Sequence, residues 1–200
     1  MSFLRNPDTL HHVLNNCPTF LEQGRYTWRH DSVLSQIVSS IKDAYSCSPC
    51  IQPEVFSDLN NQQFQLSSTI PIDVLPTAQI PDIVILWRDT KKIDLVELTI
   101  SFETNLESTE IRKTNKYAAL VSDLQAEGYS TSFVHLSVGS RGLITAHNSR
   151  NLQSVHPLSW SRKNLKELKS KIMKTSIAAS YGIYCRRKDP AWQRPELLLN

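Results

Sequence analysis

The sequence predicts an α/β domain in which a central mixed sheet is flanked by helices. Segments 80–87, 93–102 and 131–138 are rich in apolar and β-branched residues, as strands are. Segments 32–46, 108–127 and 164–181 instead carry apolar residues at helical spacing. The 200 residues, 40% of them hydrophobic and 20% charged, suffice for one folded domain with a short appendage and are not typical of a disordered chain.

The first half of the chain begins with the predicted helix 32–46, whose apolar residues recur every three or four positions. Asp31 or Ser32 can cap its start. Segment 47–65 reads as a turn, a short strand and a polar loop. Segments 80–87 and 93–102 then form a hairpin around a turn that we centre on Thr90 and Lys91.

The second half continues with the helix 108–127, the strand 131–138 and a glycine turn at 139–142. The last helix, 164–181, is basic and points Leu165, Leu168, Ile172 and Met173 inward. We expect three parts: an N-terminal appendage (1–30), an α/β core (31–160) and a basic C-terminal helix and tail (161–200).

Several classes of protein are excluded by simple features of the sequence. The longest aliphatic run, Ile83 to Trp87, is far shorter than the roughly 20 residues of a membrane span. The first ten residues lack the cationic and then apolar pattern of a signal peptide. Four cysteines without a secretion signal argue for a reducing compartment. We therefore expect an intracellular protein without a membrane partner.

The formal net charge of +3 hides an asymmetry along the chain. Between Ser161 and Lys188 there are nine basic residues and one acid, a balance of +8 that leaves −5 for the rest. A basic segment on an acidic body suggests a polyanionic partner such as DNA. The alternative is a solvated lysine face on an amphipathic helix. The candidate contacts to DNA in this segment are Lys163, Lys166, Lys169, Arg186, Arg187 and Lys188.

Two carboxylates of the predicted hairpin fall on the same face of the sheet. Because side chains alternate along a strand, Asp82 and Glu97 share a face, whereas Asp94 points the other way. The expected register makes Asp82 and Glu97 diagonal neighbours, with Cβ atoms roughly 7 Å apart. Such a pair repels and is costly to desolvate, which a shared Mg²⁺ would resolve. Alternatively, Asp82 caps the start of the strand and Glu97 has an ordinary basic partner.

The helix 108–127 adds a lysine to this face. At 100° per residue, Lys113 falls within the apolar arc that faces the sheet, and Lys116 lies on its flank. A lysine buried in this way needs an anionic neighbour, and the carboxylate pair is on that sheet. The alternative is an ion pair between Lys113 and Glu110, which shares the arc, at the edge of the core.

Three runs carry a resemblance to a known family: PDIVILWRDTKKIDLVELTISFE, RKTNKYAAL and FVHLSVGSRG. In order and spacing they resemble the restriction-like endonuclease domain of site-specific non-LTR retrotransposons, a branch of the PD-(D/E)xK nuclease superfamily. The segment Arg29-His30-Asp31 and the stretch ASYGIYCRRKDPAW also resemble parts of these proteins. The resemblance spans roughly residues 10 to 192. It implies a PD-(D/E)xK core within the α/β fold.

The resemblance also implies roles for individual residues. Asp82 matches the first acid and Glu97 the second, and both would hold Mg²⁺ or Mn²⁺. Lys113 and Lys116 match the lysines of the helix that follows. The angular position favours Lys113 as the catalytic lysine, and Lys116 would replace it or contact a phosphate. Arg141 matches the arginine of the glycine turn and would contact the DNA backbone.

The sequence departs from the family pattern at three points. Thr99 stands where the superfamily usually has its lysine, so the lysine role moves to the following helix. The zinc knuckle is incomplete, with only His12 and Cys17 present. No reverse transcriptase precedes the domain, which leads us to expect a truncated, standalone or domesticated copy. Cys47 and Cys50 have zinc-ligand spacing and could join His12 and Cys17 as a four-ligand zinc site. A Cys-x-x-Cys pair around Ser-Pro also makes a plain turn, and this is the interpretation that we favour over zinc.

The sequence thus leads to a Mg²⁺-dependent DNA endonuclease, expected in the nucleus and of open oligomeric state, with a homodimer as one option. The alternative is an inactive remnant of the same domain that still binds nucleic acid. A third alternative is a protein-interaction or structural domain whose basic segment is only a solvated face.

Overall fold

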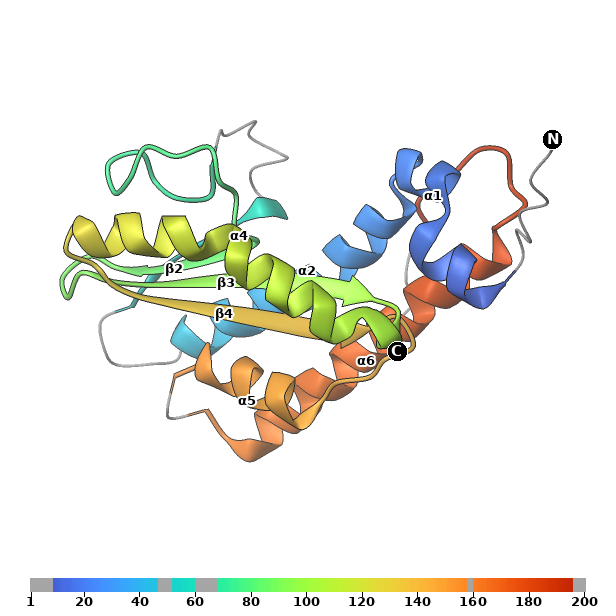
Figure 1. Ribbon diagram of the computed structural model, residues 1–200. Coiled ribbons are helices and arrows are strands. Elements are labelled where there is room, and N and C mark those ends of the chain that lie inside the picture. The colour runs from blue at the N-terminus through green and yellow to red at the C-terminus, as the bar shows by residue number, and fades with distance from the viewer. Residues whose placement is uncertain (1–8, 47–51, 60–67, 158–159, 196–200) are drawn as a thin grey trace.

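The computed structural model describes residues 9–46, 52–59, 68–157 and 160–195 (Figure 1). The N-terminal part contains a short helical turn η1 (His12–Asn16) and helices α1 (Pro18–Glu22) and α2 (Arg25–Ser46). Strands β1 (Glu54–Ser57), β2 (Ile83–Trp87) and β3 (Lys92–Ser101) follow. The rest comprises η2 (Glu103–Asn105), α4 (Leu106–Ala126), β4 (Ser130–Gly139), α5 (Ala146–Ser154) and α6 (Arg162–Cys185).

The four strands form one mixed sheet in the order β1-β2-β3-β4. β1 and β2, and β2 and β3, pair in antiparallel fashion, whereas β3 and β4 are parallel and are joined through α4. Helices cover both faces of this sheet (Figure 1). The predicted α/β class and its central mixed sheet are therefore confirmed.

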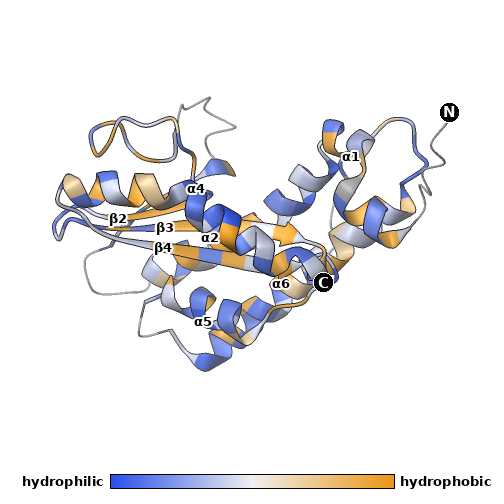
Figure 2. Ribbon diagram, viewed as in Figure 1, coloured by the Kyte–Doolittle hydropathy of each residue, from blue (hydrophilic) through white to orange (hydrophobic). Residues whose placement is uncertain are grey.

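The two faces of the sheet pack against different helices. Ile83, Ile85, Val96 and Leu98 share a core with α2, α5 and α6. The alternate residues of the same strands pack against α4. β2 consists of apolar residues and β3 carries apolar residues on both of its faces, because helices cover both faces of the sheet (Figure 2). The predicted division of residues between the two faces is correct.

The segments that we expect to form the N-terminal appendage and the C-terminal helix and tail contact each other in the structure. The boundary at residue 30 falls inside α2, which begins at Arg25 rather than near Ser32. Arg25 is fully buried and donates hydrogen bonds to the carbonyl oxygens of Arg186 (2.6 Å) and Asp189 (3.0 Å). Trp28 packs in a core with residues of α6. The N-terminal and C-terminal segments are thus packed together, and α6 also contributes to the main core.

No helix within the described ranges is long and apolar enough to cross a membrane.

His156 is a buried histidine that contacts α2, and its pKa indicates how the stability of the fold changes at acidic pH. His156 is 4% exposed, its Nδ1 donates to the Leu152 carbonyl oxygen (2.7 Å), and its Nε2 lies 3.1 Å from the Ser40 hydroxyl. Burial lowers the pKa of His156 to about 4, while the bond to Leu152 acts in the opposite direction. The unfolded chain therefore binds the proton more readily, and stability is lost as the pH falls from about 6.5 towards 4.

We expect His156→Gln to remove this acid sensitivity. Between pH 7 and pH 5 the free energy of unfolding of the wild type should fall by about 2 kcal/mol more than that of the variant. Urea denaturation at the two pH values measures the difference. Equal pH dependence in the two proteins would contradict the assignment.

Candidate active site

Asp82 and Glu97 lie opposite each other on neighbouring strands. Ile83 pairs with Val96, so continuing the register by one residue sets Asp82 against Glu97. Their exposed fractions are 7% and 2%. We expected a diagonal arrangement. The observed register is shifted by two residues, which keeps both side chains on the predicted face but makes them direct neighbours.

The shift originates in the hairpin turn. The turn spans Arg88 to Lys91. The backbone N–H of Lys91 donates to the carbonyl oxygen of Arg88 at 3.2 Å, and the φ angle of Lys91 is 47°. The Arg88 guanidinium forms ion pairs with Glu54 of β1 and with Asp73. Arg88 belongs to the turn, and Lys92 becomes the first residue of β3.

Lys113 of α4 contacts the carboxylate pair, as its angular position predicts. Its ammonium donates to Oε1 of Glu97, and the two side chains are 20% and 3% exposed. Burial raises the pKa of Glu97, the negative charge of Asp82 raises it further, and Lys113 acts in the opposite direction. Glu97 Oε2 is buried and makes no hydrogen bond to the described part of the chain.

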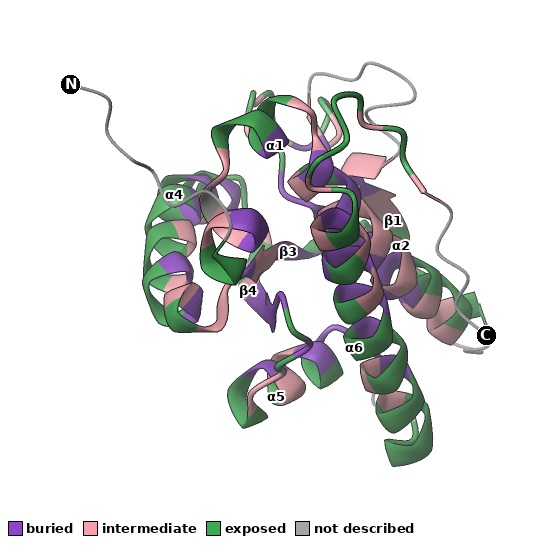
Figure 3. Cartoon of the chain, turned by 90° about the vertical axis from the view of Figure 1, so that its right-hand side faces the viewer, coloured by how far each residue is buried: buried purple, intermediate pink, exposed green. Residues whose placement is uncertain are grey.

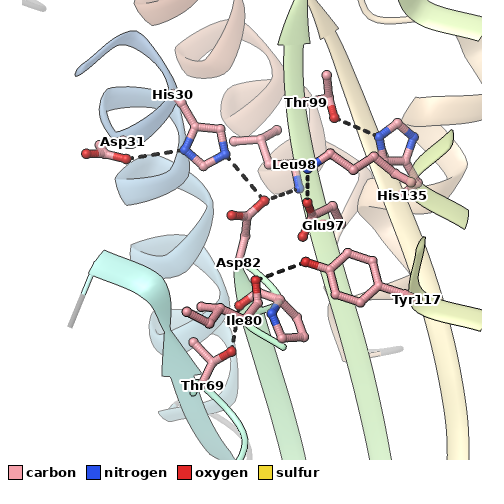
Figure 4. A network of polar contacts seen from close by, with 12 residues as sticks. His30, Asp31, Thr69, Ile80, Asp82, Glu97, Leu98, Thr99, Tyr117 and His135 are labelled. Atoms are coloured by element: carbon pink, nitrogen blue, oxygen red, sulfur yellow. Dashed lines mark hydrogen bonds and ion pairs between the residues drawn. The ribbon is translucent and has the colours of Figure 1, made fainter. Parts of the chain in front are cut away.

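The other residues of this helix have different partners. The Lys116 ammonium donates to the Tyr117 hydroxyl at 2.9 Å and lies over its ring, so it does not reach the carboxylates. The Tyr117 hydroxyl in turn donates to the Ile80 carbonyl oxygen at 2.9 Å (Figure 4). Glu110 pairs with His147 at 3.1 Å instead of with Lys113. Of the two candidate lysines, only Lys113 lies at the carboxylate pair.

His30 of α2 is a member of this site to which the sequence assigned no role. Its Nε2 lies 3.3 Å from Oδ2 of Asp82, and its Nδ1 lies 3.2 Å from Oδ1 of Asp31 (Figure 4). The same Asp82 oxygen accepts the backbone N–H of Leu98 at 2.6 Å. Burial alone would lower the pKa of His30, but the hydrogen bonds and charges of Asp31 and Asp82 outweigh it and raise the pKa to about 10. His30 is therefore an imidazolium at neutral pH and donates from both nitrogens.

The raised pKa of His30 predicts how the free energy of unfolding changes at alkaline pH. A histidine whose pKa is raised by folding stabilises fully below its unfolded pKa of about 6.5, and the contribution is lost as the pH rises through about 10. In EDTA, the free energy of unfolding of the wild type should fall by about 2 kcal/mol more than that of His30→Gln between pH 7 and pH 9. Parallel urea-denaturation curves for the two proteins would show that His30 is not charged in the fold.

His135 of β4 also faces this cluster. It pairs with Glu97 in the parallel register, and its Nε2 lies 2.9 Å from the Thr99 hydroxyl (Figure 4). Burial lowers the pKa of His135. Its Nδ1 is buried and has no hydrogen-bond partner among the described residues. The proximity of His135 to Glu97 depends on the pairing of β3 with β4, and its place in the sequence does not reveal it.

The donor atoms of the site suit magnesium better than zinc. Within the ranges that the structure describes, no group of three or more His, Cys, Asp or Glu residues could hold a metal ion. Magnesium, however, is commonly bound through one or two carboxylates and keeps several water molecules. Asp82 and Glu97 supply two carboxylates on one face, and Glu97 Oε2 lacks a partner among the described residues. These residues fit Mg²⁺ or Mn²⁺.

The residues of the suggested zinc site are only partly described. His12 lies in η1, and Cys17 is a free thiol that directly precedes α1. Cys47 and Cys50 lie outside the described residues. The four-ligand zinc arrangement is therefore untested.

The candidate DNA contacts are not gathered at the carboxylates. Lys163, Lys166, Arg186 and Lys188 are exposed on or just after α6, which packs on the face of the sheet opposite α4. The partly buried residues of the set are held by neighbours: Lys169 donates to the Ser149 hydroxyl at 3.0 Å, and Arg187 to the Tyr184 carbonyl oxygen at 3.0 Å. Arg141 pairs with Glu103 at 2.8 Å, so its charge is offset within the protein.

The fold and the site together define an α/β protein whose mixed sheet carries a buried cluster of carboxylates, histidines and one lysine. No model of a protein family matches the chain, and a search of curated proteins finds no match. Among solved structures, the chain is similar to an N-terminal domain of a reptarenavirus L protein, with 16% sequence identity. The similarity covers 78% of this chain and 94% of that chain, with a TM-score of 0.32, which is too low to carry an argument.

Proposed function

We propose that the protein is a metal-dependent DNA endonuclease with a PD-(D/E)xK core, derived from the restriction-like endonuclease domain of a non-LTR retrotransposon. The observation that carries this proposal is the position of Lys113 on α4, with its ammonium on Glu97 and with Asp82 opposite Glu97. Two carboxylates and a lysine on one face match the chemistry of phosphodiester hydrolysis. A DNA substrate would place the protein in the nucleus.

The residues of the site have distinct roles in this proposal. Asp82 and Glu97 would hold Mg²⁺, which when bound supplies a Lewis acid for the phosphate and lowers the pKa of a water molecule. His30 and the Leu98 N–H both donate to one oxygen of Asp82 and so fix the orientation of this carboxylate. Lys113 brings a positive charge to a site where negative charge develops on the phosphate during hydrolysis.

A second candidate function is a nucleic-acid-binding remnant that no longer cleaves. The observation that favours it is the position of α6, which packs on the opposite face of the sheet from Lys113. Binding by the lysines of α6 would therefore survive the loss of the carboxylate site.

Nicking of a supercoiled plasmid tests the main proposal. Relaxed plasmid should appear with the wild type in Mg²⁺ or Mn²⁺ and should be absent in EDTA. If the folded wild type binds the plasmid in the presence of Mg²⁺ and of Mn²⁺ but leaves it intact, the result would contradict the nuclease proposal and support the second candidate function. A protein that neither binds nor nicks would exclude both.

The salt dependence of DNA binding tests the role of α6. Each phosphate contact contributes about 0.9 to the slope of log K against log salt concentration. We therefore expect Lys163→Gln combined with Lys166→Gln to reduce this slope by about 2 units, as measured by fluorescence anisotropy with a labelled duplex in EDTA. Lys42→Gln, on an exposed position of α2, is the matched control. An unchanged slope in the double variant would show that these lysines form only a solvated face.

A further inference from the structure

The outer face of α6 changes character along the helix. Its first turns present Lys163 and Lys166, and its later turns present Met173, Ile177 and Tyr181 at intervals of four residues. The last three are 39%, 48% and 68% exposed. The exposed outer side of the helix is visible in Figure 3. An exposed apolar stripe on a helix this basic indicates a binding surface.

Ile177 and Tyr181 of this stripe line a groove between α6, the N-terminal helical segment and the turn after β4. We call this the α6 groove. Its apolar residues are Leu10, Leu14, Ile177, Tyr181 and Tyr184, and its polar residues are Ser140, Arg141 and Ser180. Tyr181 is the most exposed of the large hydrophobic residues in the groove. The groove therefore offers an aromatic ring at its open side.

The charges of α6 favour an anionic occupant of the groove. Arg141, which lines the groove, is paired with Glu103, so the available positive charge comes from the exposed lysines of α6. Between residues 161 and 188 the only acid is Glu167, against nine basic residues. Glu167 lies beside Lys163 at 4.0 Å, far along the helix from Tyr181. Lys174 is exposed on the same side of α6 as the stripe. Positive charge beside an exposed aromatic ring is typical of surfaces that bind single-stranded nucleic acid.

The groove lies within reach of the carboxylate site along β4. His135 pairs with Glu97, and Ser140 at the groove follows five residues later. At a rise of about 3.3 Å per residue this is roughly 17 Å, or about five steps of a nucleic-acid strand at 3.4 Å each. A single-stranded segment of about this length would span the distance between the carboxylate site and the groove.

We propose that the α6 groove binds an unpaired DNA strand, with one base stacked on Tyr181 and a neighbouring phosphate on Lys174. The inference rests on the proposed function for the class of substrate and refines it, since it makes a single-stranded segment part of the recognised DNA. An acidic peptide would also match the charge of the groove. The exposed ring of Tyr181 and the path along β4 to the carboxylates favour nucleic acid.

The test measures binding without cleavage. In EDTA, fluorescence anisotropy compares labelled oligothymidylate, a blunt duplex and the same duplex with a single-stranded tail, for the wild type and for variants. Tyr181→Ala should raise the Kd for the single strand and the tailed duplex about tenfold and leave that for the blunt duplex within twofold. Tyr181→Phe, which keeps the ring, should bind like the wild type. Ile72→Ala, at a position that is 77% exposed, is the control for loss of an exposed apolar side chain.

Salt titration separates stacking from charge. Tyr181→Ala should leave the salt slope for the single strand unchanged, whereas Lys174→Gln should reduce it by about 0.7. Equal affinity of Tyr181→Ala and the wild type for the single strand, or no binding of the single strand at all, would overturn the inference; an acidic peptide would then remain as the occupant. Because these assays contain no metal, their outcome is independent of whether the plasmid is nicked.

Discussion

Lys113→Met is expected to destabilise the protein by about 3 kcal/mol at pH 7, because it leaves the buried carboxylate of Glu97 without its counter-ion. This is a large share of the 5–15 kcal/mol that typically stabilises a domain. Folding raises the pKa of Glu97, and the loss of Lys113 removes an effect that opposes this rise. The folded variant therefore takes up a proton more readily than the unfolded chain, so its deficit should shrink as the pH falls below 7.

Urea denaturation in EDTA measures this deficit at pH 7 and pH 5. Lys163→Met is the control, because the ion pair of Lys163 with Glu167 is solvent-exposed and should be worth less than 0.5 kcal/mol by the usual magnitude of about 0–1 kcal/mol for such pairs. Adding Glu97→Gln to Lys113→Met should restore part of the lost stability, since no buried charge then remains in the pair. A deficit below about 1 kcal/mol at pH 7 would show that the pair is not buried in solution.

Asp82→Asn is expected to reduce plasmid nicking at least a hundredfold while the protein stays folded. The amide oxygen can still accept the backbone N–H of Leu98, and His30 keeps its contact with Asp31. The lost negative charge, however, removes one of the two carboxylates that the proposed function assigns to the metal. Initial rates of nicking in Mg²⁺ and in Mn²⁺, together with circular dichroism of the variant, measure the two effects separately.

Asp94→Asn is the matched control for this experiment. Asp94 is equally buried, but it lies on the opposite face of β3, where it pairs with Lys92 at 3.0 Å and accepts the Ser132 hydroxyl at 2.7 Å. Nicking by Asp94→Asn should stay within threefold of the wild type. Equal losses in the two variants would indicate a general effect of removing a buried acid, and not a role for Asp82 in the reaction.

The sequence predicted the carboxylate pair and its lysine because both depend on local periodicity. Alternation along the strands places Asp82 and Glu97 on one face, and a shift of the register by two residues does not change this. The helical period likewise places Lys113 towards the sheet. The register itself depended on the turn: β2 ends at Trp87, which pairs with Lys92, so Arg88 lies in the turn and not in the strand.

The sequence did not predict the two histidines of the site. His30 carried a detectable signal, since it continues the i, i+3, i+4 and i+7 pattern of Val33, Leu34 and Ile37 on the buried side of α2. Starting that helix near Ser32 hid the pattern. His135 carried no such signal, because its neighbour Glu97 lies on another strand.

The sequence by itself determined the α/β class, the faces of the hairpin strands, the direction of Lys113 and the basic character of α6, all of which follow from composition and from periods of 2 and 3.6 residues. Only the tertiary structure decided which acid faces which, that His30 and His135 join the carboxylates, and that the two ends of the chain share one core. These features depend on contacts between segments far apart in the chain. Packing and the burial of charge select such contacts, and no local pattern encodes them.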